Sequence, residues 1–176
     1  MANPSGFDNY FALFHLKPAF HVDRQALESA YLAVQKEVHP DMHASKTDAE
    51  KRVAMQMATL ANTAYRTLKH PVQRGLYICS QHGVDPQLES NTAMPTEFLM
   101  QQMAWREALD EAHTESALTA LLDEVQRAHQ EALQACGEQI DVQQQWDLAA
   151  QLVRRLMFIE RFMRDIEHKI DAAHDA

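Results

Sequence analysis

The chain has 176 residues, of which 46% are hydrophobic and only four are glycine, and it carries a net charge of −9. This composition excludes a disordered chain and allows one ordinary domain or two small ones. Ala, Leu, Gln, Glu and Met are abundant, and no segment alternates between apolar and polar residues, so we expect an all-α fold.

The acidic charge is concentrated in the second half of the chain. Residues 1–82 contain 9 basic and 7 acidic side chains, a net charge of +2, whereas residues 83–176 contain 7 and 18, a net charge of −11. An acidic second half disfavours nonspecific nucleic-acid binding. It indicates either a basic partner or helix faces that are simply solvated.

Targeting and redox signals are absent from the sequence. No apolar run approaches the roughly 18 residues of a membrane span, and the N-terminus lacks the pattern of a signal peptide. Cys79 and Cys136 are far apart and form no CxxC pair, so we expect neither a disulfide framework nor a zinc site. We therefore expect a cytoplasmic bacterial protein that binds neither membrane nor nucleic acid.

Three helices are predicted in the first part of the chain. A short one covers residues 10–14, and the next is capped by Asp23 and carries an apolar stripe at helical spacing: Leu27, Tyr31, Val34 and Val38. The third begins at Thr47 or Asp48, runs to about Lys69 and carries a stripe of the same kind: Met57, Ala61, Ala64 and Leu68. A polar loop therefore joins two amphipathic helices.

The tripeptide His39-Pro40-Asp41 lies in this loop. Pro40 has no amide hydrogen and disfavours helical φ/ψ angles at His39, so the preceding helix ends there. We expect the imidazole of His39 and the carboxylate of Asp41 to be exposed at the tip of the loop.

This arrangement resembles the J domain, the module that stimulates ATP hydrolysis by DnaK-type chaperones. The resemblance extends to residues 10–14 in the first helix, and to residues 60–68 with the following His70-Pro71 in the third. It implies that His39, Pro40 and Asp41 bind the chaperone, together with Lys36. Other positions that are commonly basic in J domains are Gln25, Glu28, Leu32 and Ala33 here, so strong stimulation of a general DnaK is not expected.

Four further helices complete the prediction. Pro71 starts a helix that ends near Gly83, and residues 83–95 contain the Pro and Gly of a linker, so we expect a first domain over residues 1–82. Thr96 caps a helix to about His113, a second runs from about Glu115 to Ala135 and stops at Gly137, and a third runs from about Asp141 to Ala173. Short loops between these three predict a three-helix bundle over residues 96–176.

The first bundle helix has apolar residues on two opposite faces. One face contains Phe98, Gln102, Trp105, Leu109 and Ala112, and the other contains Leu99, Met100 and Met103 beside Glu107 and Glu111. We expect the Trp105 face to be buried, which leaves an apolar patch with an acidic border. In the last helix Phe158 likewise lies off the apolar seam. Such a patch either binds a partner or packs against the first domain.

A J domain followed by an acidic three-helix bundle resembles the HscB family, co-chaperones of iron–sulfur cluster assembly. The similarity includes residues 98–100, 106–107, 109–111, 153–154 and 156 with 158. It implies that the bundle binds the IscU-type scaffold on which clusters are built, through Leu99, Met100, Met103, Glu107, Glu111 and Phe158. Ala104 stands where an acidic residue is frequent in this family. The J domain would then act on an HscA/DnaK-type chaperone, and no cofactor is implied.

Three other functions were weighed. His39 and His43 have a metal-ligand spacing, but Pro40 breaks the helix that would align them, so no metal site is expected. The sequence has no Gly-rich phosphate loop, GxSxG motif or Cys–His pair, so no catalytic residue is assigned and an enzyme is not expected. The nearer alternative is a J-domain co-chaperone for a different client, and the more distant one is a metal-binding helical protein.

Overall fold

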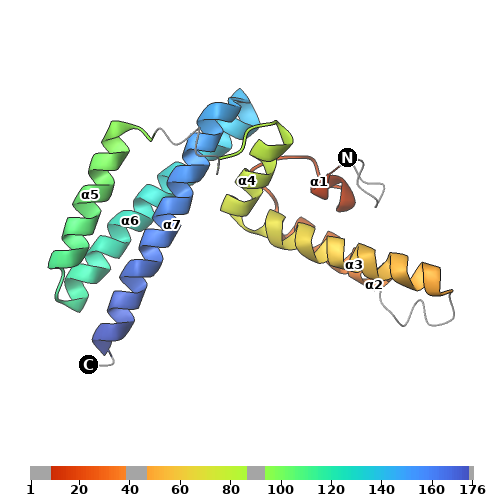
Figure 1. Ribbon diagram of the computed structural model, residues 1–176, viewed down its shortest axis with the longest axis horizontal. Helices are drawn as coiled ribbons and strands as arrows, with labels where there is room; N and C mark the ends of the chain where they lie inside the picture. The colour runs from red at the N-terminus through yellow and green to blue at the C-terminus, as the bar shows by residue number, and fades with distance from the viewer. Residues whose placement is uncertain (1–8, 39–46, 87–93, 175–176) are drawn as a thin grey trace. The chain divides into compact units, whose positions relative to one another are not determined.

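The computed structural model describes residues 9–38, 47–86 and 94–174. Within these ranges every regular element is a helix, which confirms the expected all-α fold (Figure 1). The chain divides into two compact units, Met1–Ile78 and Cys79–Ala176.

The first unit is built from short-range capping interactions at the expected positions. Its helices are α1 (Tyr10–Leu13), α2 (Arg24–Val38), α3 (Asp48–Lys69) and most of α4 (Pro71–Gln81). The Oδ1 of Asp23 accepts hydrogen bonds from the backbone N–H groups of Gln25 and Ala26, and Thr47 forms a capping box with Glu50. These side chains satisfy the free N–H groups at the starts of α2 and α3, as predicted.

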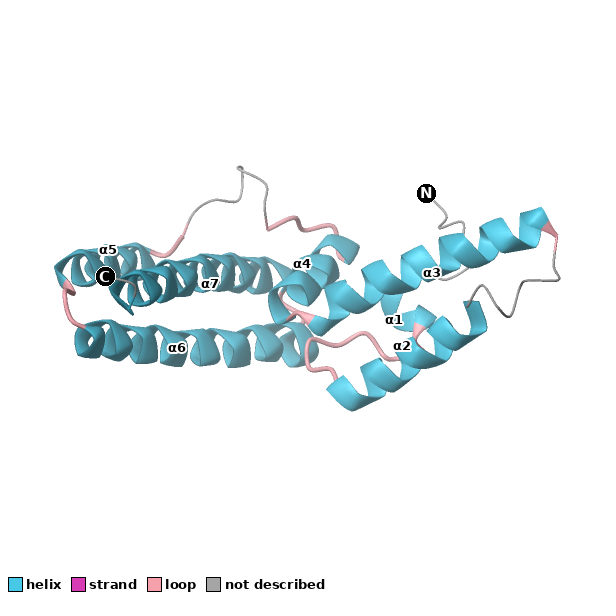
Figure 2. Ribbon diagram, turned by 90° about the horizontal axis from the view of Figure 1, so that it is seen from below, coloured by secondary structure: helices cyan, strands magenta, loops and turns pink. Residues whose placement is uncertain are grey.

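Helices α2 and α3 pack side by side as a hairpin, and α1 packs on α3 (Figure 2). Three alanines on α3 are buried, which brings the helix axes close: Ala54, Ala61 and Ala64. The ring of Tyr31 on α2 stacks on Tyr65 of α3 at a centroid distance of 4.1 Å. The hydroxyl of Tyr31 also donates to Asn62 Oδ1 at 2.8 Å. The two helices that flank residues 39–46 are therefore held together by aromatic and polar contacts.

The second unit contains α5 (Thr96–Glu111), α6 (Glu115–Gly137), a π-helical segment η3 (Glu138–Gln143) and α7 (Trp146–His174). Its core consists of one apolar face from each long helix, and the fully buried side chains include Leu118, Val125, Val153, Leu156, Ile159 and Ile166. His129 on α6 lies 3.4 Å from Glu160 on α7. These elements form the expected three-helix bundle, in which α6 and α7 make the most extensive contact (Figure 1).

The helix ends in the bundle differ from the expectation in three places. Pro95 occupies the N-cap position of α5 and Thr96 is the first helical residue, so the hydroxyl of Thr96 caps nothing. Gly137 is the last residue of α6 but does not turn the chain, because its φ of −61° and ψ of −43° are helical and the chain continues directly into η3. Gln144 ends that segment in a left-handed conformation, and α7 begins at Trp146 rather than near Asp141. Glycine tolerates the right-handed helix as well as the left-handed turn, so its presence alone does not fix a stop.

The end of α4 is a predicted stop that the structure confirms. Gly83 has a φ of +77°, and the N–H groups of Gly83 and Val84 bond to the carbonyls of Ser80 and Cys79, which is a Schellman motif. The imidazole of His82 stacks on the indole of Trp146 at 3.5 Å, and Pro86 is fully buried. Several residues after Ile78 are therefore packed, although the sequence pattern assigns residues 83–95 to a linker.

Candidate functional site

The first candidate site is the loop between α2 and α3. His39, Pro40 and Asp41 lie outside the described residues. Lys36 is in the last turn of α2 and is exposed to solvent. Tyr31 and Tyr65 stack seven residues before the end of α2 and 17 residues after the start of α3, and they hold the two helices together.

The second candidate site is the outward face of α5. Leu99, Met100 and Met103 are 45%, 66% and 71% exposed, and Glu107 and Glu111 are exposed on the same face. On the opposite face Phe98 and Trp105 are buried, and the indole Nε1 of Trp105 donates to Glu124 Oε1 on α6 at 2.8 Å. The expected division of α5 into a buried and an exposed face is therefore confirmed. We call Leu99, Met100, Met103, Glu107 and Glu111 the α5 face.

Phe158 lies at the edge of this surface and is only partly buried. Its ring contacts Phe98 edge-on at 5.7 Å and stacks with Phe162 at 6.1 Å. The guanidinium of Arg106 lies 5.9 Å from the centre of the Phe158 ring. Phe158 therefore belongs partly to the seam between α5 and α7, whereas the sequence pattern places it outside the seam. Periodicity within α7 misses this contact because Phe98 and Arg106 reach the ring from another helix.

Two arginines on α7 differ in their surroundings. The three guanidinium nitrogens of Arg154 are buried and make no hydrogen bond within the described residues, and burial lowers the pKa of this group. The charged group of Arg154 is thus buried, although the residue as a whole is partly exposed. The neighbouring Arg155 lies over the ring of Phe98, with its guanidinium carbon 4.7 Å from the ring centre, and its Nη2 donates to Gln101 Oε1 at 3.4 Å.

Neither unit presents an obvious chemical centre. In the ranges that the structure describes, no three His, Cys, Asp or Glu side chains are grouped so that they could hold a metal ion. None of the helices described here is long and apolar enough to cross a membrane. What the arrangement can do is bind, because three exposed large apolar residues form a contiguous group on α5 with an acidic border.

Comparisons with known proteins agree with this reading. A model of the HscB C-terminal oligomerisation domain matches residues 94–167. A co-chaperone protein HscB homologue of Bordetella avium is 48% identical over 160 residues, which are 90% of this chain and 95% of that protein. The homologue of Cupriavidus taiwanensis is 48% identical over 171 residues, 96% of this chain and 97% of that protein.

A solved structure is similar over almost the whole chain. The chaperone HscB from Vibrio cholerae has a TM-score of 0.80 and 34% sequence identity, and the match covers 94% of this chain and 99% of that one. Both units are therefore shared with these relatives. The chain belongs to the HscB family of co-chaperones, and the co-chaperone function in iron–sulfur cluster assembly that its sequence predicts is confirmed.

Proposed function

We propose that this co-chaperone is a two-armed adaptor. One arm, the loop with His39, Pro40 and Asp41 together with Lys36, binds an HscA-type ATPase chaperone. The other arm, the α5 face together with Phe158, binds the IscU-type scaffold. Neither arm performs chemistry of its own, and the cytoplasm is the compartment in which we expect both partners.

The exposure of Leu99, Met100 and Met103 is the observation that supports this proposal most strongly. Exposure of these three large apolar side chains to water is unfavourable, because fully burying one such side chain stabilises a protein by roughly 1.5–3 kcal/mol. Methionine adapts its shape to a partner, and the exposed Glu107 and Glu111 favour a partner with basic groups around an apolar centre.

The chaperone arm requires a different kind of interaction. ATP hydrolysis by the partner is accelerated only if the loop binds the hydrolysis-competent state of the chaperone more tightly than its resting state. The contacts between α2 and α3 support this role, because they hold together the two helices between which His39, Pro40 and Asp41 lie in the sequence.

A steady-state ATPase assay tests the chaperone arm. His39→Gln should abolish stimulation of an HscA-type chaperone while the melting temperature stays the same. His43→Gln, a change of the same type in the same loop, is the matched control and should stimulate normally. If His39→Gln stimulated as well as the unmodified protein, the assignment of this arm would be wrong.

Calorimetric titration of the full chain with the scaffold tests the other arm. Binding should be saturable and should weaken in Leu99→Ala and Met103→Ala. Absence of binding by the unmodified chain would refute the scaffold as the client and would favour a co-chaperone for a different client.

A further inference from the structure

A groove lies at the N-terminal end of α5, and Arg155, three residues before Phe158 on α7, is one of the residues that line it. Helix α5 has 16 residues and α7 has 29, which at 1.5 Å per residue corresponds to about 24 Å and about 43 Å. The contacts of Phe98 with Phe158 and of Trp105 with Phe162 place α5 along the later part of α7. The first turns of α7 therefore extend beyond the start of α5, and among the described residues α5 does not cover α7 and η3 there.

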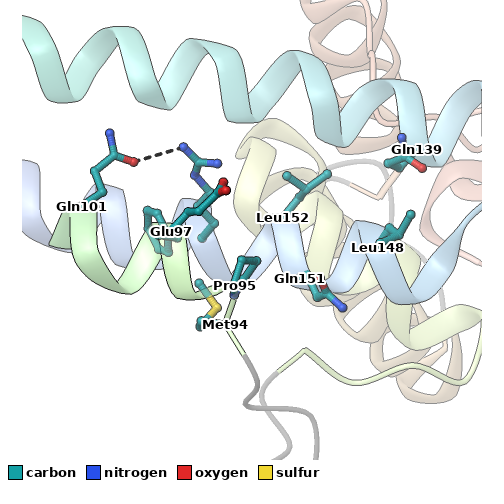
Figure 3. A pocket seen from close by; sticks show the side chains of 10 residues that line it. Met94, Pro95, Glu97, Gln101, Gln139, Leu148, Gln151 and Leu152 are labelled. Atoms are coloured by element: carbon teal, nitrogen blue, oxygen red, sulfur yellow. Dashed lines mark hydrogen bonds between the residues drawn. The ribbon is translucent and has the colours of Figure 1, made fainter.

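The uncovered region forms a hollow of about 530 Å³ (Figure 3). Met94 and Pro95, just before α5, line one end of it. The other walls come from three elements and include Phe98 and Gln101 on α5, Gln139 on η3, and Leu148, Leu152 and Arg155 on α7. Figure 3 shows Leu148 and Leu152 facing the hollow from α7, with Glu97 and Gln101 on the opposite side. Leu148 is 47% exposed, so part of the apolar wall is open to solvent.

Arg155 provides the charge of this groove. Its guanidinium lies over Phe98, its hydrogen bond to Gln101 is long at 3.4 Å, and its Nε is buried without a hydrogen-bond partner in the described part of the chain. Neither Glu97 nor any other described carboxylate forms an ion pair with it. A partly buried cation that forms no ion pair and lies beside an apolar wall favours a ligand with one carboxylate and an apolar body.

The groove is continuous with the α5 face. Glu97 lines the groove and is three residues from Met100, so the two side chains are neighbours on one helix surface. Gln101 lines the groove and directly follows Met100 in the sequence. An α-helix with its side chains is only about 10–12 Å across, so a protein that covers Leu99, Met100 and Met103 can reach the groove by crossing α5.

We propose that the groove is a second part of the scaffold-binding surface, an inference that rests on the proposed function. An apolar segment of the scaffold lies along Leu148 and Leu152, and an acidic side chain of that segment pairs with Arg155. The scaffold thus covers the outward face of α5 and continues past the N-terminal end of this helix into the groove. This arrangement requires a carboxylate on the partner. Binding to the acidic α5 face alone does not require one.

Calorimetric titration of the full-length protein with the scaffold tests the inference. Leu148→Ala and Arg155→Gln should each weaken binding about three- to tenfold, and Arg155→Lys, which keeps the charge but not the planar fork, should lose less than Arg155→Gln. Val142→Ala is the matched control, because Val142 on η3 is 64% exposed and does not line the groove. Its affinity should stay within twofold of the unmodified protein. Leu148 is exposed, so its truncation should leave the melting temperature unchanged.

Met103→Ala, measured in the same titrations, separates the inference from the proposed function. If Met103→Ala weakens binding but Leu148→Ala and Arg155→Gln do not, the groove is not part of the interface and the inference is overturned while the proposed function stands. If Met103→Ala also has no effect, the proposed scaffold surface itself is wrong. Sedimentation velocity adds an independent readout: a change in self-association in Leu148→Ala without a change in scaffold affinity would identify the groove as a contact between copies and overturn the inference.

Discussion

Met103 and Met55 are equally exposed, at 71% each, but their surroundings differ. Met103 lies one turn from Leu99 and Met100. The positions one turn from Met55 on α3 hold no large apolar side chain, since they are Lys51, Arg52, Ala58 and Thr59. A single exposed apolar side chain is common on protein surfaces, but a contiguous group of three is typical of a binding site. The two residues are therefore a matched pair for testing the α5 face.

Met103→Ala should weaken scaffold binding by about 1–2 kcal/mol, which is roughly a five- to thirtyfold loss of affinity. Met55→Ala removes the same side chain at the same exposure and should leave the affinity unchanged. Neither variant should alter the denaturation midpoint, because neither side chain is buried. An equal effect of both substitutions on binding would show that the α5 face is not specific.

Phe158→Ala should affect both stability and binding. The ring is partly buried against Phe98 and Phe162, so its removal should lower the free energy of unfolding by about 2–3 kcal/mol, somewhat below the loss typical of a fully buried phenylalanine. Phe162→Ala, at a fully buried position, is the control and should cost more. Urea denaturation of both variants checks this order. An unchanged unfolding midpoint in Phe158→Ala would mean that the ring is not part of the seam.

Cys79 makes stability depend on pH in the alkaline range. Burial raises the pKa of its thiol to about 11 from an ordinary value near 9. Between these pH values the unfolded chain loses the thiol proton while the folded chain keeps it, so the free energy of unfolding should fall as the pH rises from about 9 to about 11. Cys79→Ala should flatten this part of the curve, measured by urea denaturation at several pH values. A slope that is the same in both proteins would rule out Cys79 as its source.

At the scale of helices, the predicted boundaries that the structure confirms are those set by side chains within a few residues. Asp23, Thr47 and Gly83 act on their own helix ends through short hydrogen bonds or a left-handed turn, which a sequence displays directly. A glycine alone does not predict a turn, because it can also continue a helix, as Gly137 does. The buried and exposed faces of α5 were also predictable, since its apolar residues occupy two opposite sides.

Gly83→Ala tests the turn that ends α4. Alanine at a φ of +77° is strained, so the free energy of unfolding should fall by about 1 kcal/mol, although no atom would clash with the added Cβ. Gly83→Asn should lose less, because asparagine tolerates the left-handed region better than alanine. Denaturation curves for the two variants give the comparison. If alanine and asparagine were equally well tolerated, the left-handed turn would not be what ends the helix.

At the scale of the whole molecule, contacts between helices were not predictable from periodicity. The partial burial of Phe158 depends on Phe98 and Arg106, which lie more than 50 residues earlier, and the groove beside Leu148 depends on where α5 begins along α7. Such features arise from relative helix lengths and positions rather than from the pattern within one helix. The placement of the two arms on one chain has a functional consequence, since tethering raises the effective concentration of the scaffold at the chaperone.

The chaperone ATPase rate during a scaffold titration tests the adaptor mechanism most directly. The proteins compared are the unmodified chain, His39→Gln, the Leu99→Ala/Met103→Ala double variant, and an equimolar mixture of these two variants with the same total of each intact arm. We expect the double variant to stimulate ATP hydrolysis without the additional increase that scaffold gives, and we expect His39→Gln to give no stimulation. The mixture should behave like the double variant alone. A mixture that reproduced the full scaffold-dependent increase of the unmodified chain would contradict the account, because the two arms would then not need to be on one molecule.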